Sequence, residues 1–470
     1  MDTIKDRYET QSAGPKYRAL VGAIRDAVEV KALSPGEKLP PVRDLAWELG
    51  ITPGTVARAY TILTDERLLK AEVGRGTFVA EAERETGLLP DPFVNRDPYP
   101  HGTNGKGYPV SLMSPGMPEI GQAMFIRRLL GDIAADPPSG IMHYPTRDAF
   151  RPAREAVKHW LRDTPLGMLD ESDIVLSHGG QNAILLVMQA ILRGRRPVVL
   201  VEELAYPGFR RAAELLRAEV VPVAMDGYGI RPDALEAVAG GDAQILCTTP
   251  EAHNPTCLLT PESRRQEIAE VARRHNLQIL EDDCYRLNDA QAPSYRQIAP
   301  ERGWYISSLS KSLTPALRVG FAVAPKGKGA DLRRAAEHGF FGLATPLADL
   351  TAQMLTDPRT ERFAHDVAEA FEARLRVALN HLGGFELKWR SGVPFIWLSL
   401  PEGWRTAAFC RAAEAEGVRV RSAEDFALRE ARVPHAVRVS LNAAVSDDVF
   451  DAAIRKLGAL LHAPPESVEV

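Results

Sequence analysis

Short apolar runs alternate with helix-like segments through the middle of the chain. The strand-like runs lie at residues 174–176, 198–201, 220–223, 245–247 and 279–280. Between them, apolar residues recur at helical spacing over residues 181–192, 207–218, 233–238 and 261–275. Such alternation is typical of an open, mostly parallel sheet with helices on both faces. We therefore predict an α/β fold for this region.

The first 80 residues follow a different pattern, with three helical segments and then a ribbon. Apolar residues recur at helical spacing over residues 17–28, and a second short helix is predicted over residues 42–50. A third helix follows Thr52, whose hydroxyl can cap it. Two short helices joined by a tight turn predict a helix-turn-helix, and the glycine-flanked segment 72–79 predicts a β-ribbon after it.

Residues 81–109 separate these two patterns. They are rich in proline, glycine and polar residues and show no hydrophobic period. This composition predicts a partly stiff linker that lets the head move relative to the body. We predict a winged helix-turn-helix head over residues 12–80, the linker over 81–109, and a body over 110–470.

The composition is that of an ordinary globular protein. The chain has 470 residues, 45% of them hydrophobic and 25% charged, which is enough material for more than one domain. No run approaches the roughly 20 apolar residues of a membrane helix, and the N-terminus has no signal-peptide core. The four cysteines are scattered without disulfide or metal spacing. We expect a cytoplasmic protein with no membrane segment and no metal site.

The net charge gives little support for nucleic-acid binding. It is −5 for the whole chain, and residues 1–80 hold 12 Lys and Arg against 11 Asp and Glu. A DNA-binding head normally carries a clear positive stripe, because phosphate contacts dominate its affinity. The prediction of a DNA-binding head therefore rests on its pattern and not on its charge.

Glycines and polar side chains follow the predicted strands of the body, where ligands gather in such sheets. Gly180 and Gln181 open a helix after the first strand, and a helix N-terminus favours an anion such as phosphate. Tyr206 follows the next strand and could stack on a ring, although a lone tyrosine there is more often simply packing. Asn254, which follows another strand, could donate a hydrogen bond to a phenolate oxygen.

The last strand of this series is followed by Asp282 and Tyr285. Asp282 could hold a pyridinium nitrogen protonated, and Tyr285 could reach the adjacent phenolate. Paired acids also occur in metal sites, but no histidine lies at ligand spacing. Further along the chain, Ser308 and Arg318 flank Lys311 and could grip a phosphate from either side.

Three motifs of the head closely resemble the winged helix of GntR-type regulators: Leu39–Ala46, Thr55–Tyr60 and Gly74–Val79. The resemblance implies DNA contacts at Arg43, Thr52, Thr55 and Arg75, and also at the neighbouring Arg58. Pro53 departs from the family, because many members place an arginine there. The alternative is a small protein-interaction module whose arginines are merely solvated.

From about residue 110 to residue 460 the chain resembles the fold type I, aspartate-aminotransferase-like pyridoxal-phosphate proteins. The resemblance implies a large and a small subdomain and the cofactor pyridoxal 5′-phosphate. Lys311 matches the Schiff-base lysine, which is the catalytic residue, and Asp282 matches the partner of the pyridine nitrogen. The other residues that match cofactor contacts are Gly180, Gln181, Tyr206, Asn254, Tyr285, Ser308 and Arg318.

Two further residues match ligand contacts of that family. Arg438 matches the arginine that holds the α-carboxylate of an amino acid as a bidentate fork. Tyr144 matches a tyrosine that, in this family, usually contributes to the site of the other subunit of the dimer.

The sequence also departs from the family at several glycine positions. Cys257 stands where a glycine normally ends the motif that begins at Asn254, and alanines stand for glycines at 149 and 316. Leu204-Ala205 replaces a usual Pro-Gly before Tyr206. None of these changes removes a chemical group, but they make the loop shapes, and hence efficient turnover, uncertain.

A winged helix ahead of this fold resembles the MocR-type regulators, a branch of the GntR regulators. The resemblance implies a head-to-tail homodimer that binds double-stranded DNA at two half-sites. One hypothesis is a transcription regulator that senses an amino acid or related amine by Schiff-base exchange at Lys311. The alternatives are an active aminotransferase with an appended head, and a sensor of pyridoxal phosphate itself.

Overall fold

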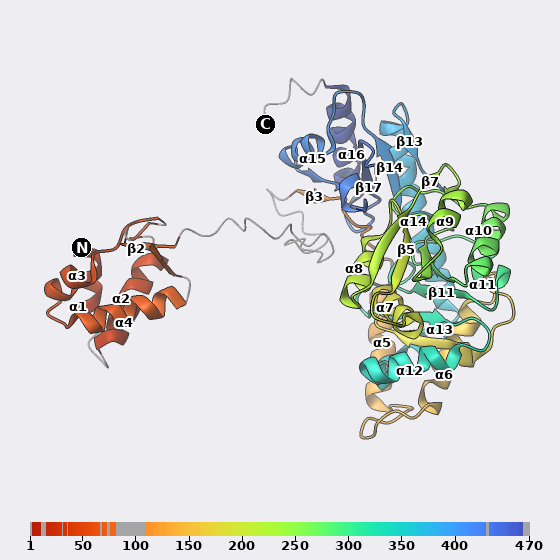
Figure 1. Cartoon of the computed structure of the whole chain (residues 1–470), viewed down its shortest axis with the longest axis horizontal. Coiled ribbons are helices and arrows are strands. Elements are labelled where there is room, and N and C mark those ends of the chain that lie inside the picture. Colours follow the sequence, from red (N-terminus) through yellow and green to blue (C-terminus); the bar gives the residue numbers. More distant parts are fainter. Residues whose placement is uncertain are drawn as a thin grey trace. The chain divides into compact units, whose positions relative to one another are not determined.

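The chain forms two compact units, a head within residues 1–94 and a body within residues 95–470 (Figure 1). The computed structural model describes residues 2–10, 16–30, 32–34, 36–65, 68–72, 76–80, 109–428 and 432–463. Except for Pro109, the predicted linker lies outside the described residues. Within the described ranges, no helix has the length and apolar character needed to cross a membrane.

The head is a small helical unit closed by a two-stranded ribbon. Its elements are α1 (Asp2–Thr10), α2 (Lys16–Glu29), α3 (Val42–Glu48), α4 (Pro53–Asp65), β1 (Leu69–Glu72) and β2 (Gly76–Val79). The two strands pair antiparallel. This arrangement confirms the predicted winged helix-turn-helix.

The apolar positions that predicted the three head helices form one core. Leu20, Ile24, Leu45, Val56 and Leu63 are all fully buried. The sequence pattern did not predict α1. Among its described residues, Ile4 and Tyr8 pack against this core, and two apolar positions are too few to show a helical period.

The body is built on a seven-stranded sheet, as the alternating pattern predicted. The strand order is β4-β12-β11-β10-β9-β5-β6, and only β12 is antiparallel to its neighbours. The strands are β4 (Ile174–Ser177), β5 (Val198–Glu202), β6 (Glu219–Val223), β9 (Ala243–Thr248), β10 (Gln278–Asp282), β11 (Gly303–Ser308) and β12 (Gly320–Val323). The four predicted helices are α7 (Gly180–Ile191), α8 (Pro207–Leu215), α9 (Pro232–Val238) and α10 (Glu262–Arg274).

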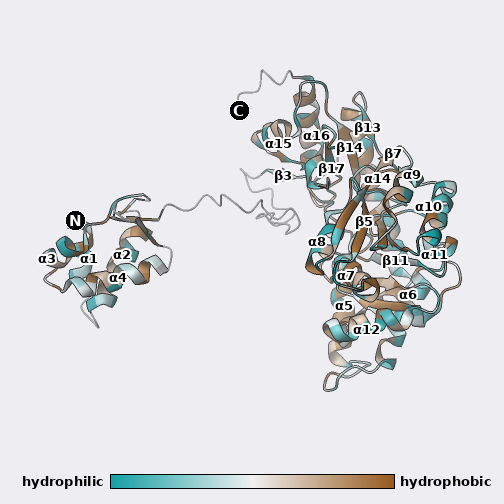
Figure 2. Ribbon diagram, in the orientation of Figure 1, coloured by the Kyte–Doolittle hydropathy of each residue, from teal (hydrophilic) through white to brown (hydrophobic). Residues whose placement is uncertain are grey.

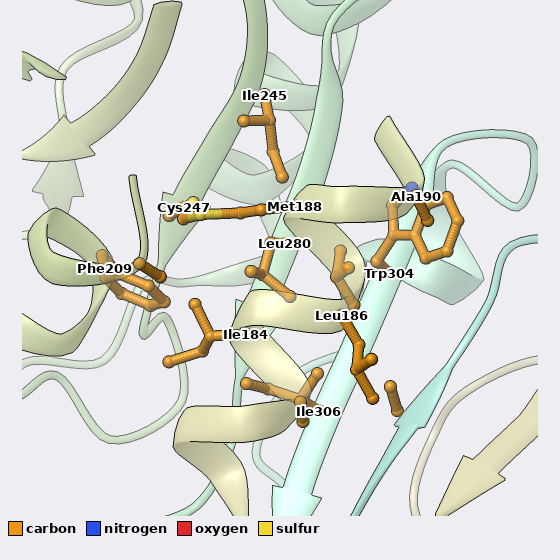
Figure 3. Packing of buried hydrophobic residues seen from close by; sticks show 14 of the residues in the cluster. Ile184, Leu186, Met188, Ala190, Phe209, Ile245, Cys247, Leu280, Trp304 and Ile306 are labelled. Carbon is orange, nitrogen blue, oxygen red and sulfur yellow. The ribbon is translucent and has the colours of Figure 1, made fainter. Parts of the chain in front are cut away.

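Both faces of this sheet are covered by apolar packing. On one face, Ile184 and Met188 of α7 pack against Cys247, Leu280 and Ile306 of the strands (Figure 3). The other face is covered by α9, α10, α11 (Tyr295–Ile298), α5 (Gln122–Ala135), α6 (Arg151–Trp160) and α13 (Thr345–Thr356). The sheet strands are accordingly drawn mostly brown in Figure 2, whereas α10 carries much hydrophilic colour. Successive strand residues point to opposite faces, so the continuous apolar runs follow from burial on both sides.

The C-terminal part forms the small subdomain. Its sheet has the order β13-β14-β17-β16, with β13 (Leu387–Lys388), β14 (Phe395–Ser399), β16 (Arg421–Ser422) and β17 (Ala436–Ser440). It packs with α14 (Arg359–Leu382), α15 (Thr406–Ala415) and α16 (Asp447–His462). One strand from far away in the sequence, β3 (Val110–Ser111), joins this subdomain by pairing parallel with β15 (Val418–Arg419) (Figure 1).

The remaining short elements complete the body. They are α12 (Gly329–Phe340), the hairpin β7 (Met225–Asp226) and β8 (Gly229–Ile230), and three 3-10 turns at Asp148–Phe150, Glu171–Asp173 and Ala423–Asp425. A mostly parallel large sheet with a separate small subdomain confirms the predicted fold class.

Candidate functional site

The predicted cofactor residues converge because their strands end at one edge of the large sheet. Glu202, Thr248, Asp282 and Ser308 are the last residues of four adjacent parallel strands. In the antiparallel register, Gly320 pairs with both Ser308 and Ser177 and so brings the preceding Arg318 to the same edge. The loops that follow these strands form the walls of the site.

A close-packed cradle for an anion lies at the N-terminus of α7. Gly179 has φ +81°, and a Cβ there would lie 2.9 Å from a terminal nitrogen of Arg318. A Cβ on Gly180 would lie 2.7 Å from the Cys284 sulfur. Backbone N–H groups at a helix N-terminus, a guanidinium and a hydroxyl suit a phosphate group. The structure therefore brings Gly180, Ser308 and Arg318 together.

Gln181 closes the side of this cradle. Its amide nitrogen donates to the carbonyl of Gly208 at 3.0 Å, and its buried Oε1 has no hydrogen-bond partner within the described residues. The Tyr206 ring lies close by and packs edge-on against Phe209, with 6.1 Å between the ring centroids. Burial raises the pKa of the Tyr206 hydroxyl, and nearby Tyr285 and Asp282 raise it further. Tyr206 thus lies near Tyr285 and Asp282, two of the other predicted cofactor contacts.

Asp282 supplies the carboxylate expected beneath a pyridine ring. Its side chain is buried and accepts a hydrogen bond from the Cys284 N–H at 3.0 Å. Burial raises the pKa of this carboxyl to about 6, because little surrounds it that would compensate the charge. A protonated ring nitrogen would provide the missing counter-charge.

Lys311 and Tyr285 lie close to each other. The Lys311 ammonium nitrogen is 5.5 Å from the centroid of the Tyr285 ring. The Tyr285 ring packs edge-on against Phe395 of the small subdomain at 5.2 Å between centroids. Lys311 is only half-buried, so a ligand can reach its amine.

Asn254 and Arg438 join the two subdomains across the pocket. Arg438 donates from Nη1 to the Asn254 Oδ1 at 2.6 Å. This bond turns the Asn254 amide nitrogen away from the arginine, and that buried nitrogen has no hydrogen-bond partner among the described residues. An unused donor at this point suits the phenolate oxygen of the cofactor.

The Arg438 guanidinium is held between two aromatic rings. Its central carbon lies 5.0 Å from the centroid of Phe395 and 4.9 Å from that of Phe426. Burial, and to a smaller extent the neighbouring Arg421, lower the pKa of Arg438 to about 10. The group still carries its charge at neutral pH, and the two rings set the orientation of a fork that suits a bidentate anion.

The sequence prediction missed two groups that support the site. Glu202 is fully buried and accepts hydrogen bonds from the Thr248 hydroxyl at 2.6 Å and from the Thr249 N–H at 3.2 Å. The His253 ring lies 3.3 Å from the same carboxylate, and Asn254 N–H donates to the Thr249 hydroxyl. Glu202 ends β5 and His253 lies in the loop after β9, and this placement was the only signal that could have identified them.

Tyr144 does not join the other site residues within one chain. Its side chain is 87% exposed and lies near Phe341, with 6.2 Å between the ring centroids. The loop that bears it is fastened by Ser139, whose hydroxyl donates to Asp349 at 2.6 Å. A contribution of Tyr144 to a neighbouring site stays a prediction.

The cysteine in a glycine position preserves the shape of its loop. Cys257 has φ +60°, the left-handed conformation that glycine adopts most easily. A non-glycine residue there costs about 1–2 kcal/mol. The Cys257 side chain is buried and donates from sulfur to the carbonyl of Phe395 at 3.2 Å. The backbone conformation that the glycine would give is therefore retained.

The head presents several of its predicted DNA contacts at the surface. Thr52 caps α4, since its hydroxyl accepts the Thr55 N–H at 3.3 Å, as predicted. Arg43 is exposed, and the Arg58 guanidinium lies over the Tyr17 ring at 4.1 Å from its centroid. Arg75 lies outside the described residues. Their contacts with DNA remain predictions.

Comparisons with known proteins agree with both halves of this description. Residues 130–457 match the family of class I and II aminotransferases, and residues 16–79 match the gntR family of bacterial regulatory proteins. An HTH-type transcriptional regulator of Bacillus subtilis is 28% identical over 445 residues, which cover 91% of this chain and 90% of the relative.

Two more similarities concern the cofactor and the fold. The vitamin B6 salvage pathway transcriptional repressor PtsJ of Salmonella typhimurium is 27% identical over 460 residues, covering 96% of this chain and 98% of that protein. The crystal structure of Pyrococcus horikoshii kynurenine aminotransferase superposes with a TM-score of 0.67 at 22% identity, covering 78% of this chain and 93% of that one. That structural likeness shows the fold alone. The chain belongs to the aminotransferase class I and II family, whose cofactor is pyridoxal 5′-phosphate, and its GntR-family head makes it a MocR-type transcription regulator.

Proposed function

We propose that this regulator senses an amino acid or related amine at Lys311 and changes its DNA binding in response. The observation that supports this most is the combination, on one chain, of a winged helix with a pocket that has both an amine-reactive lysine and a carboxylate clamp. When bound, the cofactor would supply an aldehyde that reacts reversibly with amines, and Lys311 is the amine of this chain that an incoming ligand amine would have to displace. Arg438 then orients the carboxylate of that amine.

The chain's own residues have separate tasks in this proposal. The α7 N-terminus and Arg318 hold the phosphate, and Asp282 keeps the ring nitrogen protonated. Asn254 positions the phenolate oxygen, and Tyr206 covers the ring. These contacts fix the cofactor, so that only Lys311 and the Arg438 side chain need to change partners when an amine enters.

The second candidate function is an aminotransferase whose head is secondary. The observation in its favour is that Lys311 and Asp282 are the groups that a proton shift at the bound substrate would need. The 2-aminoadipate transaminase of Thermus thermophilus is 29% identical over 327 residues, covering 66% of this chain. The head favours regulation, because turnover has no need of it.

A head-to-tail homodimer in the cytoplasm completes the proposal. Ile141, Met142, Tyr144 and Phe341 are exposed apolar side chains, at 68%, 82%, 87% and 75%. Such a group on one surface is typical of a protein–protein interface. A dimer would let two heads bind two half-sites of double-stranded DNA.

One experiment separates the candidate functions. The purified protein with bound cofactor is mixed with each of the standard amino acids, and both the cofactor absorbance and the affinity for the chain's own promoter DNA are measured. Regulation predicts an absorbance change and a changed DNA affinity, with no more than one equivalent of keto acid formed. Many equivalents of keto acid with unchanged DNA affinity would instead establish an aminotransferase. If only the comparison of cofactor-free with cofactor-loaded protein changed DNA affinity, the protein would sense pyridoxal phosphate itself.

A further inference from the structure

The first described stretch after the head is fastened to the small subdomain along its whole length. This stretch, residues 110–116, is called the strap below. Val110 N–H donates to the carbonyl of Gly417 at 2.7 Å and Leu112 N–H to that of Arg419 at 2.8 Å. In return the strap accepts hydrogen bonds from three small-subdomain groups: Ser440 N–H on Leu112, Asn442 Nδ2 on Ser111 and Ala443 N–H on Gly116.

The strap also contacts the ligand clamp directly. Arg438 donates from Nη2 to the carbonyl of Met113 at 2.8 Å, while its Nη1 donates to Asn254. Arg421, its direct cross-strand neighbour on β16, donates from Nε to the same Met113 carbonyl at 3.0 Å. Two guanidinium groups thus share one backbone oxygen at the edge of the ligand pocket.

We propose that the strap transmits ligand binding from Arg438 to the chain segment that leads to the DNA-binding head. This proposal rests on the proposed function and names the route of its regulation. A carboxylate is a stronger acceptor than a backbone carbonyl and forms shorter hydrogen bonds with a guanidinium. The Arg438 guanidinium is planar and confined between Phe395 and Phe426, so it moves as one unit when a carboxylate draws it. A displaced Nη2 either lengthens its bond to Met113 or pulls the strap along.

The strap is positioned to pass on such a displacement. Leu112 is fully buried in the small-subdomain core, so the strap can shift against the subdomain only by loosening the hydrogen bonds that join the two. The covalent chain runs from the strap through residues 81–108 to the head, and a shift of the strap therefore moves the attachment point of that segment. Ligand binding can alter the preferred head arrangements only if the ligand binds more tightly to one strap position than to the other. The Arg438–Met113 hydrogen bond provides such a difference, because it changes when a carboxylate binds Arg438.

Gly116 allows the strap to be tested without touching the cofactor site. A Cβ there would lie 2.0 Å from the Asn442 Oδ1, so Gly116→Ala must displace Asn442 and its bond to Ser111. Gly384→Ala is the matched control, because a Cβ at Gly384 meets no atom within 4 Å and the residue belongs to the same subdomain. Both variants keep Lys311, Asn254 and Arg438.

The full-length, cofactor-loaded proteins are titrated with the standard L-amino acids, with cofactor absorbance and promoter-DNA affinity as readouts. For the amino acid with the largest absorbance change, Gly116→Ala should keep its half-maximal concentration within about threefold but lose a DNA-affinity change of about tenfold or more. Gly384→Ala should behave like the wild type. A Gly116→Ala protein that retains the full DNA response would overturn the proposal.

Hydrogen exchange on the wild-type protein provides a second test, which does not depend on the folding of any variant. Saturation with the same amino acid should speed exchange of the amides of Leu112, Ser440 and Ala443 by about tenfold, because their bonds join the strap to the subdomain. An absorbance change with unchanged exchange at these amides would overturn the strap proposal alone. If no amino acid changed the wild-type absorbance, the amine-sensing function itself would fail, and the strap proposal with it.

Discussion

The phosphate cradle and the carboxylate clamp are two parts of the candidate site, and they are built in different ways. The cradle is built largely of backbone at the edge of a single sheet, where a Cβ on Gly320 would lie 2.6 Å from the Gly179 carbonyl carbon. The clamp is formed by side chains that bridge the two subdomains, from Asn254 to Arg438, with the Met113 carbonyl as a third partner. A close-packed backbone can hardly move without breaking the sheet, whereas the clamp can exchange one partner for another. The difference suggests that the cradle fixes the cofactor and the clamp responds to the ligand.

The largest expected effect comes from removing the clamp. Arg438→Ala should raise the half-maximal concentration of a responding amino acid by about 100-fold, or about 3 kcal/mol, since it deletes a buried, charged fork. Ethanolamine, which has an amine but no carboxylate, should act on the variant and the wild type within about threefold of each other. The readout is the absorbance of the bound cofactor. An equal loss for both compounds would show that Arg438 supports the cradle as well, and would remove the contrast between the two regions.

A second effect, of similar size, concerns the buried interior on the face of the sheet opposite α7, where Glu281 faces α10 and α11. Glu281 on β10 is buried beside Arg265, at 3.6 Å, and burial raises the pKa of its carboxyl from 4.5 to about 7. In the unfolded chain this group loses its proton near pH 4.5, while the folded protein keeps it to about pH 7. The wild type should therefore lose stability on the order of 3 kcal/mol through this group as the pH rises across that window.

Glu281→Gln should lack that part of the pH dependence. The measurement is urea unfolding of the body at about pH 5 and pH 7.5, with the exposed Glu267→Gln on α10 as the control. If the free energy of unfolding changed with pH equally in the variant and the wild type, the Arg265 charge would be keeping Glu281 ionised. The interior around Glu281 would then be more polar than its burial suggests.

The smallest expected effect lies in the head and should leave both sides of the pocket unchanged. Thr52→Ala removes the cap of α4 and should lower the stability of the head by about 1 kcal/mol. Thr52→Ser keeps the hydroxyl and should restore most of the loss. Thermal unfolding followed by helix content reports the head, and the cofactor absorbance reports the pocket. A change in cofactor absorbance would link Thr52 to the pocket, contrary to this expectation.

Sequence patterns predicted the residues that follow strands better than the buried groups that support them, for a physical reason. Asp282, Asn254 and Gly180 follow strands of one parallel sheet, and the carboxyl ends of such strands meet at one edge. The alternation of strands and helices was therefore enough to bring them together. The fully buried Glu202 was missed because nothing local marks a carboxylate whose partners come from other strands.

The sequence pattern could not predict the strap either. Its two-residue strand β3 pairs with a strand that lies about 300 positions later, and a run so short carries no periodicity. The shared Met113 carbonyl depends on a backbone atom, which every residue type has. Only the folded arrangement could place Arg421 and Arg438 on the same oxygen.

The central claim is that amine exchange at Lys311 controls DNA binding. The most direct test measures the affinity of the cofactor-loaded protein for its promoter DNA, with and without a responding amino acid, for the wild type, Lys311→Ala and the surface control Lys326→Ala. The wild type and Lys326→Ala should change affinity by about tenfold, and Lys311→Ala should not respond at any concentration. A Lys311→Ala protein whose DNA affinity still follows the amino acid as in the wild type would contradict the account.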